Sequence, residues 1–259
     1  MRRPLSSPAG MPQRVGYTRA DRFAQPATCG DHGGSADSMS SSTIQEYLEA
    51  IYKLSLKGEV RPTQIADGLG VSGPTVTATL RRLEAAGLVT RPDGGVDLTD
   101  QGRREAIDVV RRHRLAERFL VDALGLPWDS VHEEACLLEH AMSPRVLESL
   151  ERFLDNPSVC PHGHPIPTVE GVLPVLAGVP LSSLVAGSQG TVVRVSEDDD
   201  KVVSYLGSIG LVPSAQVRVL EVAPFDGPML LVVSGAERAV SLEVAQCVFV
   251  EVAKTVARD

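Results

Sequence analysis

The chain has 259 residues, a formal net charge of −8, four cysteines and a single tryptophan. This length allows two or three domains with separate cores, and the acidic balance excludes a basic coat for nucleic acid, so any DNA contact must come from a local patch. The cysteines are far apart and form no CxxC pair, which indicates a reducing compartment, and no apolar run is long enough to span a membrane. We therefore expect a cytoplasmic protein with no membrane partner.

The first 38 residues are rich in Pro, Gly, Ser and Arg and show neither a helical nor a strand period. This composition predicts a disordered extension. Met39 stands just ahead of the first patterned segment, and we interpret it as a candidate natural start. From Ser42 to Gly58 apolar residues recur at three-to-four spacing, which predicts a helix. Glu46, three residues after Thr43, would complete a capping box there and needs no other role.

The segment 62–84 has the pattern of a helix-turn-helix, with a short helix, a turn at Gly70 and a second helix capped by Ser72. Residues 87–98 then predict a β-hairpin, so the whole segment is expected to form a winged helix whose second helix lies in the major groove of DNA. The candidates for contacts with bases or phosphates are Ser72, Pro74, Thr75, Thr77, Thr79, Arg81, Arg82 and Arg91. The alternative is that this unit serves only for packing.

A long helix is expected from Gln101 to about Leu124, and within it His113 and Glu117 lie four residues apart on one face. Such a pair can ligate one ion, or it can form a hydrogen-bonded surface pair. The segment 131–140 concentrates more chemistry, because in a helix four metal-competent side chains share one face. These are His132, Cys136, Glu139 and His140, whose imidazole, thiolate and carboxylate groups suit a first-row transition ion.

Two later segments also carry residues of the ligand type. The run 160–167, Cys-Pro-His-Gly-His-Pro-Ile-Pro, is constrained by three prolines, and we expect a structural corner rather than a ligand site. Short alternating strands between about 190 and 252 predict a small barrel. The acidic run 197–200 stands at the end of a predicted strand; a solvated turn is the default interpretation, and a carboxylate lent to a neighbouring metal is the alternative.

The order of these segments resembles the diphtheria toxin repressor family of iron- and manganese-dependent transcriptional regulators. The resemblance covers about residues 40–253 and rests on the helix start at 72–76, on Arg-His-Arg-Leu-Ala-Glu-Arg at 112–118 and on the segment 131–140. It implies a mainly α protein with a small β domain. The implied parts are a disordered extension (1–38), a winged helix-turn-helix DNA-binding domain (39–107), a helical metal-binding and dimerisation domain (108–175) and an SH3-like, FeoA-like barrel (176–259).

The resemblance also implies two adjacent metal sites in each subunit. The regulatory site would consist of Glu46, Cys136, Glu139 and His140, and the ancillary site of His113, Glu117 and His132 with Asp198 from the barrel, Glu197 or Asp199 being the alternatives. The carboxylate of Glu46 favours Mn²⁺, whereas the thiolate of Cys136 favours Fe²⁺. We expect Mn²⁺ or Fe²⁺, with manganese slightly favoured and with Zn²⁺, Co²⁺ or Ni²⁺ able to substitute.

The function that the resemblance implies is a metal-dependent transcriptional repressor that controls metal homeostasis, not an enzyme. It is expected to bind double-stranded operator DNA as a metal-loaded homodimer, because a dimer presents two recognition helices to a palindromic site. Two alternatives stay open at this point. One is a metalloenzyme in which His, Glu and Cys side chains activate water through an ion, and the other is a metal-independent winged-helix DNA-binding protein.

Overall fold

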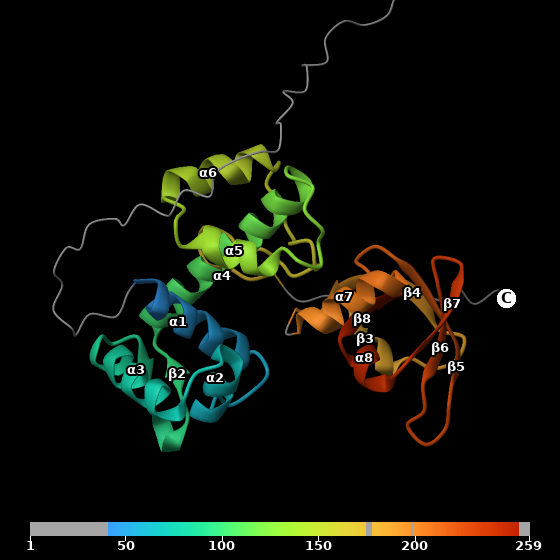
Figure 1. Ribbon diagram of the computed structural model, residues 1–259, viewed down its shortest axis with the longest axis horizontal. Coiled ribbons are helices and arrows are strands. Elements are labelled where there is room, and N and C mark those ends of the chain that lie inside the picture. The colour runs from blue at the N-terminus through green and yellow to red at the C-terminus, as the bar shows by residue number, and fades with distance from the viewer. Residues whose placement is uncertain (1–40, 175–177, 198, 254–259) are drawn as a thin grey trace, which may run out of the picture. The chain divides into compact units, whose positions relative to one another are not determined.

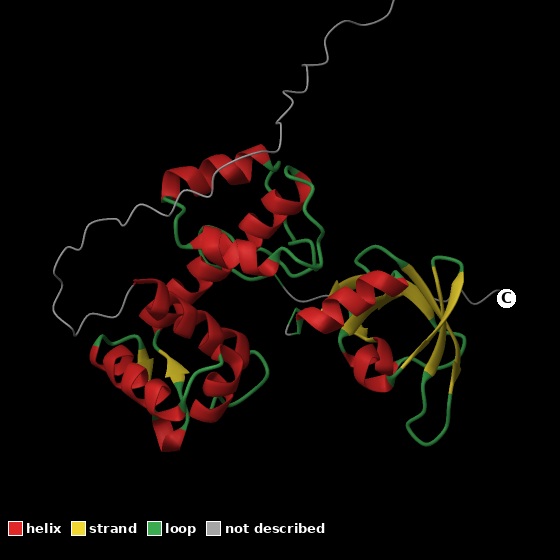
Figure 2. Cartoon of the chain, viewed as in Figure 1, coloured by secondary structure: helices red, strands yellow, loops and turns green. Residues whose placement is uncertain are grey.

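The computed structural model describes residues 41–174, 178–197 and 199–253. The predicted disordered extension and Asp198 lie outside these residues. Helices dominate the described chain up to Phe153, and strands dominate it from Val179 onward (Figure 2). The prediction of a mainly α protein with a small β domain is thus confirmed. No helix in the described ranges combines the length and the apolar character needed to cross a membrane.

Three helices and a short hairpin form the N-terminal unit (Figure 1): α1 (Ser41–Ser55), α2 (Pro62–Leu69), α3 (Gly73–Ala85), β1 (Val89–Thr90) and β2 (Asp97–Leu98). The three helices bury Leu48, Ile51, Ile65, Val76 and Leu80 against one another. The α3 helix begins where the Ser72 side chain accepts a hydrogen bond from the backbone of Thr75. Because β1 and β2 pair antiparallel behind these helices, the predicted winged helix is confirmed.

One long helix, α4 (Asp100–Asp122), belongs to two cores. Its first half gives Ala106 and Val110 to the core of the N-terminal unit. Its second half gives Leu115 and Leu120 to a second core, which is shared with α5 (His132–Glu139) and α6 (Pro144–Phe153). The helix therefore continues without a break across the boundary predicted between residues 107 and 108. Side chains on its second half can receive partners from both units.

The C-terminal unit is one antiparallel sheet with two short helices, α7 (Asp200–Ile209) and α8 (Leu242–Gln246). Its strands are β3 (Val179–Pro180), β4 (Gln189–Val195), β5 (Gln216–Val222), β6 (Met229–Val233), β7 (Ala236–Val240) and β8 (Val248–Val252), in the order β3-β8-β4-β5-β6-β7. The small β domain is present as predicted, but its sheet is not a closed barrel, because β3 and β7 remain edges among the described strands. With only two residues, one of them a proline that lacks an N–H donor, β3 cannot close the ladder.

The end of β4 is held against the helical units by polar contacts. His164 Nε2 donates a hydrogen bond to the carbonyl of Val195 at 2.9 Å. Two residues further on, Glu197 lies 3.6 Å from Lys53 Nζ on α1 and 3.8 Å from Arg114 Nη2 on α4. These contacts bring a carboxylate of the C-terminal unit beside α4.

Candidate metal centre

The centre is built on two residues of α4, His113 and Glu117, which lie one helical turn apart and are 1% and 0% exposed. His113 Nε2 lies 3.2 Å from Glu117 Oε1, and His113 Nδ1 lies 2.7 Å from Glu139 Oε2 on α5. Burial alone would lower the pKa of His113, but its contacts with Cys136, Glu117 and Glu139 raise that pKa well above its ordinary value. Burying ionisable groups costs free energy unless they are paired or bind a metal. The row of buried ionisable side chains formed by Glu117, His113 and Glu139 therefore indicates a functional site.

Glu49 of α1 joins His113 and Glu139 in what we call the first cluster. One ligand atom from each of the three buried side chains lies within 4.8 Å of the others. Burial opposes the ionisation of Glu49, but the ammonium of Lys53 lowers the pKa of this carboxyl. Two carboxylates and one imidazole form a donor set that suits Mn²⁺ or Fe²⁺. The cluster is assembled from three helices, α1, α4 and α5, the first of which belongs to the N-terminal unit.

His132 and Cys136 of α5 lie against the same imidazole. The Sγ atom of Cys136 is 3.9 Å from His113 Nδ1 and 3.8 Å from His132 Nε2. Burial would raise the pKa of the Cys136 thiol, but the two imidazoles lower it, which favours the thiolate, the form that binds metals. His132 Nδ1 also lies 4.0 Å from Glu117 Oε1. The predicted neighbours His113, Glu117 and His132 are thus brought together.

Glu46 does not join Cys136, Glu139 and His140 in a cluster of ligand atoms, where the resemblance implied it. Its side chain is exposed, and α1 already begins at Ser41, so Glu46 neither joins the buried ligand groups nor forms a capping box with Thr43. The preceding residue, Gln45, places Oε1 2.7 Å from His140 Nδ1. The start of α1 therefore does meet His140, as predicted, but the carboxylate that α1 turns into the core is Glu49. Glu46 as a metal ligand therefore stays a prediction, with Glu49 as the alternative from the same helix.

A second cluster consists of Glu117, Cys160, His162 and Glu197, whose ligand atoms also lie within 4.8 Å of one another. Two buried carboxylate oxygens in it, Glu117 Oε2 and Glu197 Oε2, have no hydrogen-bond partner, and His162 Nδ1 has only a long contact of 3.4 Å with Glu117 Oε1. Buried polar atoms without a partner are rare in folded proteins. A divalent transition ion would satisfy these donors, and it would also stabilise the thiolate of Cys160, whose pKa burial otherwise raises. The residues present therefore fit a metal.

The segment 160–167 is the corner that the prolines predicted, but it is more than a structural element. Gly163 adopts a left-handed backbone (φ 85°), and its amide donates to the carbonyl of Cys160 at 2.9 Å. This tight turn directs Cys160 and His162 towards Glu117, while His164 turns to β4. We did not expect ligands here. The available signal was the Cys-Pro-His spacing itself, since a rigid turn can hold alternate residues on one side.

The carboxylate that the C-terminal unit contributes also comes from a different residue than the expected Asp198. Asp198 lies outside the described residues, and the adjacent Glu197 is the carboxylate found in the second cluster. Burial would raise the pKa of Glu197, but His164, Lys53 and Arg114 hold it well below its ordinary value. Asp199 instead caps α7 by accepting a hydrogen bond from the backbone of Lys201. Of the two candidates among the described residues, Glu197 is thus the one that meets α4.

The candidate DNA-binding residues divide into two faces of the N-terminal unit. Ser72, Pro74, Thr75, Arg81 and Arg82 are exposed, while Thr77 and Arg91 are partly buried. Thr79 is only 7% exposed, because it lies three residues after Val76 and four before Leu83 on the face of α3 that packs into the core. Thr79 thus lies on the packed face of α3, away from the exposed candidates, and a DNA contact of Thr79 stays a prediction.

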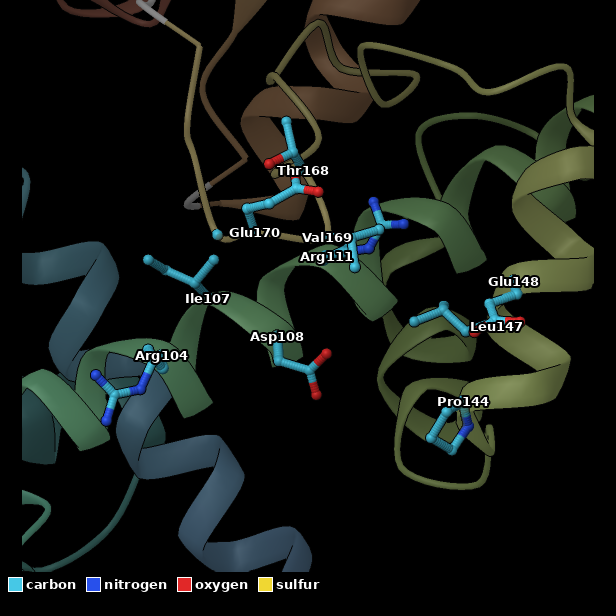
Figure 3. Close-up of a pocket in the computed structure, with 11 residues that line it drawn as sticks. Arg104, Ile107, Asp108, Arg111, Pro144, Leu147, Glu148, Thr168, Val169 and Glu170 are labelled. Carbon is cyan, nitrogen blue, oxygen red and sulfur yellow. The ribbon is translucent and has the colours of Figure 1, made fainter.

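A separate cavity of about 240 Å³ lies between α4, α6 and the turn at 168–171 (Figure 3). Asp108 and Arg111 of α4 line it on one side, and Glu148 of α6 and Glu170 of the turn line it elsewhere. Arg111 is already paired with Glu151 and donates to the carbonyl of Pro167 at 2.8 Å. No His or Cys lines this cavity, so it is not part of the metal centre.

Three protein-family models match successive parts of the chain. The iron dependent repressor N-terminal DNA binding domain matches residues 39–96, the iron dependent repressor metal binding and dimerisation domain matches 99–168, and the FeoA domain matches 179–252. Both clusters take ligands from the second of these ranges, together with Glu49 from the first and Glu197 from the third.

Relatives that match over almost their whole length are themselves repressors. The chain is 42% identical over 229 residues to the iron-dependent repressor IdeR of Mycobacterium leprae (strain TN), covering 81% of this chain and 96% of that protein. It is 35% identical over 219 residues to the diphtheria toxin repressor of Corynebacterium diphtheriae, with coverages of 81% and 96%. Among solved structures, a manganese-dependent transcriptional repressor in complex with manganese matches with a TM-score of 0.75 and 38% identity, covering 80% of this chain and 98% of that chain.

Proposed function

The chain belongs to the family of iron-dependent transcriptional repressors, and from this premise we propose that it binds operator DNA as a homodimer when divalent ions fill two adjacent sites in its helical core. Its function is metal-dependent repression of transcription, and the family consists of DNA-binding regulators rather than enzymes. The metalloenzyme alternative is thereby set aside. The observation that carries the proposal is the position of Glu49, a buried carboxylate of α1 beside His113 and Glu139.

The first proposed site uses Glu49, His113 and Glu139, with Cys136 and His140 as the adjoining ligands from α5. The second uses Glu117, Cys160, His162 and Glu197. The support for this division is that Glu49, His113 and Glu139 place one ligand atom each within 4.8 Å of the others, as do Glu117, Cys160, His162 and Glu197. Cys136 adjoins the first set through His113, with which it forms a third such group together with His132. It differs from the pattern implied by the resemblance, because His113 moves to the first site and the proline-rich corner supplies half of the second.

The ion that we propose for these sites is Mn²⁺ or Fe²⁺, with manganese favoured for the first site. The carboxylates of Glu49 and Glu139 favour the harder Mn²⁺, whereas the thiolate of the adjoining Cys136 favours Fe²⁺, and the two carboxylates outnumber the one thiolate. The similar repressor cited above was solved with manganese, and another similar structure, ScaR, was solved with bound Zn²⁺ at 33% identity. Zn²⁺, Co²⁺ and Ni²⁺ are therefore expected to substitute in the test tube.

The connection from the metal sites to DNA runs through α1. Glu49 lies next to Leu48 and two residues before Ile51, both of which pack against α2 and α3. A cation bound between the carboxylates of Glu49 and Glu139 would attract both. It would thereby fix α1 against α5. The α3 helix, with Thr75 and Arg81 on its exposed side, is then held at one position. By reciprocity, operator DNA must tighten metal binding by the same factor, typically about 5- to 150-fold.

A second copy of the chain is the proposed partner of the helical unit. Leu137 of α5 and Phe153 of α6 are 74% and 68% exposed, and Leu124 after α4 is 56% exposed. Phe119 extends this apolar surface, with its ring centroid 6.4 Å from that of Phe153. Large exposed apolar side chains in one unit indicate a surface that is covered in the functional assembly. A dimer formed here would present two α3 helices to a palindromic operator.

The test is a measurement of operator affinity for the full chain at fixed salt, with Mn²⁺, with Fe²⁺ under anaerobic conditions, and with a chelator. We expect at least tenfold tighter binding with either metal, within the range of coupling between sites. Equal affinity in metal and chelator would contradict the proposal. A scrambled duplex of the same length controls for non-specific binding to phosphates.

A further inference from the structure

Lys53 lies between the two clusters and has no role in either site as assigned above. Its Nζ atom is 3.0 Å from Glu49 Oε1, in the first cluster, and 3.6 Å from Glu197 Oε1, in the second. The side chains of Glu49 and Glu197 are 10% and 9% exposed, whereas that of Lys53 is 28% exposed. One ammonium group therefore serves one carboxylate of each cluster.

This ammonium is a charged partner of both carboxylates. A lysine side chain is ordinarily an ammonium at neutral pH, and the carboxylates of Glu49 and Glu197, 3.0 and 3.6 Å away, are its counter-charges. A cation bound to Glu49 or to Glu197 would supply the same kind of partner as the ammonium does. Two positive groups cannot share these oxygens without strong repulsion, because charges a few ångströms apart interact strongly where water is scarce.

A cavity next to the Lys53 side chain offers its ammonium group a second position. The side chain lines this cavity of about 550 Å³, whose wall includes Leu56 and Lys57 just after α1, Arg114 of α4, Arg194 of β4 and Phe249 of β8, together with Glu197. The guanidinium of Arg194 lies over the Phe249 ring, with Cζ 3.5 Å from the ring centroid. A lysine has a flexible four-carbon stem, so it can swing its ammonium group without a change in the backbone. Lys53 can therefore leave the carboxylates while the surrounding helices stay in place.

We propose that Lys53 is a displaceable counter-ion that couples the two metal sites, an inference that rests on the proposed function. When Glu197 is engaged in the second site, Lys53 loses one of its two carboxylate partners and faces additional positive charge, so it moves into the cavity. Glu49 then lacks its counter-ion, and the first cluster attracts a cation more strongly. Since coupling is reciprocal, filling the first site tightens the second by the same factor. Lys53 is thus a positioning residue for metal activation.

The chain contains its own reporter for the second site. Trp128 is the single tryptophan, its ring centroid is 5.2 Å from that of His162, and its carbonyl accepts a hydrogen bond from His162 Nε2 at 2.9 Å. Titration of the full chain with Mn²⁺ alone, followed by tryptophan fluorescence, therefore measures occupancy near His162. Glu139→Gln disables the first site in this experiment, and it is chosen because Lys53 pairs with Glu49 and not with Glu139.

The experiment is a double-mutant cycle. With Lys53 present, we expect Glu139→Gln to weaken Mn²⁺ binding at the second site by about 5- to 150-fold. In the Lys53→Met background, we expect the same change to alter that affinity by less than about twofold, the limit for independent sites. We also expect Lys53→Met alone to bind Mn²⁺ more tightly than the native chain, because a competitor is gone. Lys53→Arg is the matched control; it keeps the charge and is expected to keep the coupling.

Coupling of native size in Lys53→Met, or identical second-site affinities in the native chain and in Glu139→Gln, would overturn the proposal. A native chain that binds no Mn²⁺ in equilibrium dialysis would instead overturn the proposed function, so the two failures are distinct. Circular dichroism and thermal unfolding check that each variant folds. If Lys53→Met does not fold, the same cycle with Lys53→Gln, which removes the charge but keeps a polar end, decides the question by the same criteria.

Discussion

The Nδ1 atom of His113 lies 2.7 Å from Oε2 of Glu139, and this contact joins α4 to α5 in a part of the core where both residues are 1% exposed. The same two side chains belong to the first cluster together with Glu49. A buried ionisable pair of this kind is costly to break, because the remaining partner keeps its desolvation penalty. The contact therefore has a role in folding as well as a proposed role in metal binding.

Glu139→Gln is expected to abolish the metal response of operator binding and to lower the free energy of unfolding by about 1 kcal/mol, since the neutral amide still accepts a hydrogen bond from His113. The measurements are DNA retardation with and without Mn²⁺ and urea unfolding followed by circular dichroism. Glu134→Gln, an exposed change on the same helix, is the control and is expected to alter neither quantity. A full metal response in Glu139→Gln would remove Glu139 from the first site.

Glu49→Gln and Glu46→Gln form a matched pair on α1. The first changes a buried carboxylate beside His113, and the second changes an exposed one. We expect Glu49→Gln to weaken Mn²⁺-dependent operator binding at least tenfold, by loss of a ligand and of the link from α1, and Glu46→Gln to have a smaller effect. Metal titrations of DNA binding measure both. The opposite order of effects would restore Glu46 as the ligand from α1.

Cys160→Ser tests the second site through its only sulfur donor. A hydroxyl binds soft ions less well than a thiolate, so we expect a larger loss of affinity for Co²⁺ and Zn²⁺ than for Mn²⁺. With Co²⁺, the near-ultraviolet charge-transfer absorption of a cobalt–thiolate bond should decrease. Cys247→Ser is the control, because the Cys247 thiol donates to the carbonyl of Glu243 at 3.7 Å and is not part of either cluster, and it is expected to leave the spectrum unchanged. An identical spectrum in Cys160→Ser would show that this thiol is not a ligand.

Gly163→Ala tests the corner that carries Cys160 and His162. A Cβ atom at Gly163 would lie 2.0 Å from the carbonyl oxygen of Val193, in addition to the cost of its left-handed backbone. We expect a loss of about 3 kcal/mol in the free energy of unfolding, together with weaker metal binding at the second site. The control is Gly187→Ala, which has a similar φ of 88° but no atom within 4 Å of the added carbon. It should cost only about 1 kcal/mol, and equal losses would contradict the argument.

Arg81→Ala tests the exposed side of α3. If Arg81 contacts a phosphate, its removal should weaken operator binding for all sequences alike and reduce the slope of log affinity against log salt by about 1. Thr79→Val changes the opposite, buried side of the same helix. It should alter stability without changing the salt slope. A Thr79 variant with the larger effect on DNA affinity at equal stability would reverse this assignment of faces.

The sequence alone determined the features that depend on neighbouring residues. Helical periodicity and the cap at Ser72 predicted the helices, and the hairpin and strands followed from their turn residues. The i, i+4 spacing of His113 and Glu117 predicted that they share one face of α4, and the structure places them there. These predictions succeed because hydrogen bonds and side-chain directions within one element repeat with a known period.

Only the tertiary structure decided which candidate side chains meet. Glu46 and Glu49 are three residues apart, so they occupy adjacent positions around α1, and only the packing of α4 and α5 against that helix makes Glu49 the buried one. Cys160 and His162 reach Glu117 because Gly163 turns tightly against β4, and Lys53 reaches both clusters because the end of β4 lies beside α1. Contacts between segments more than 30 residues apart depend on how whole elements pack, and no local period in the chain encodes that packing.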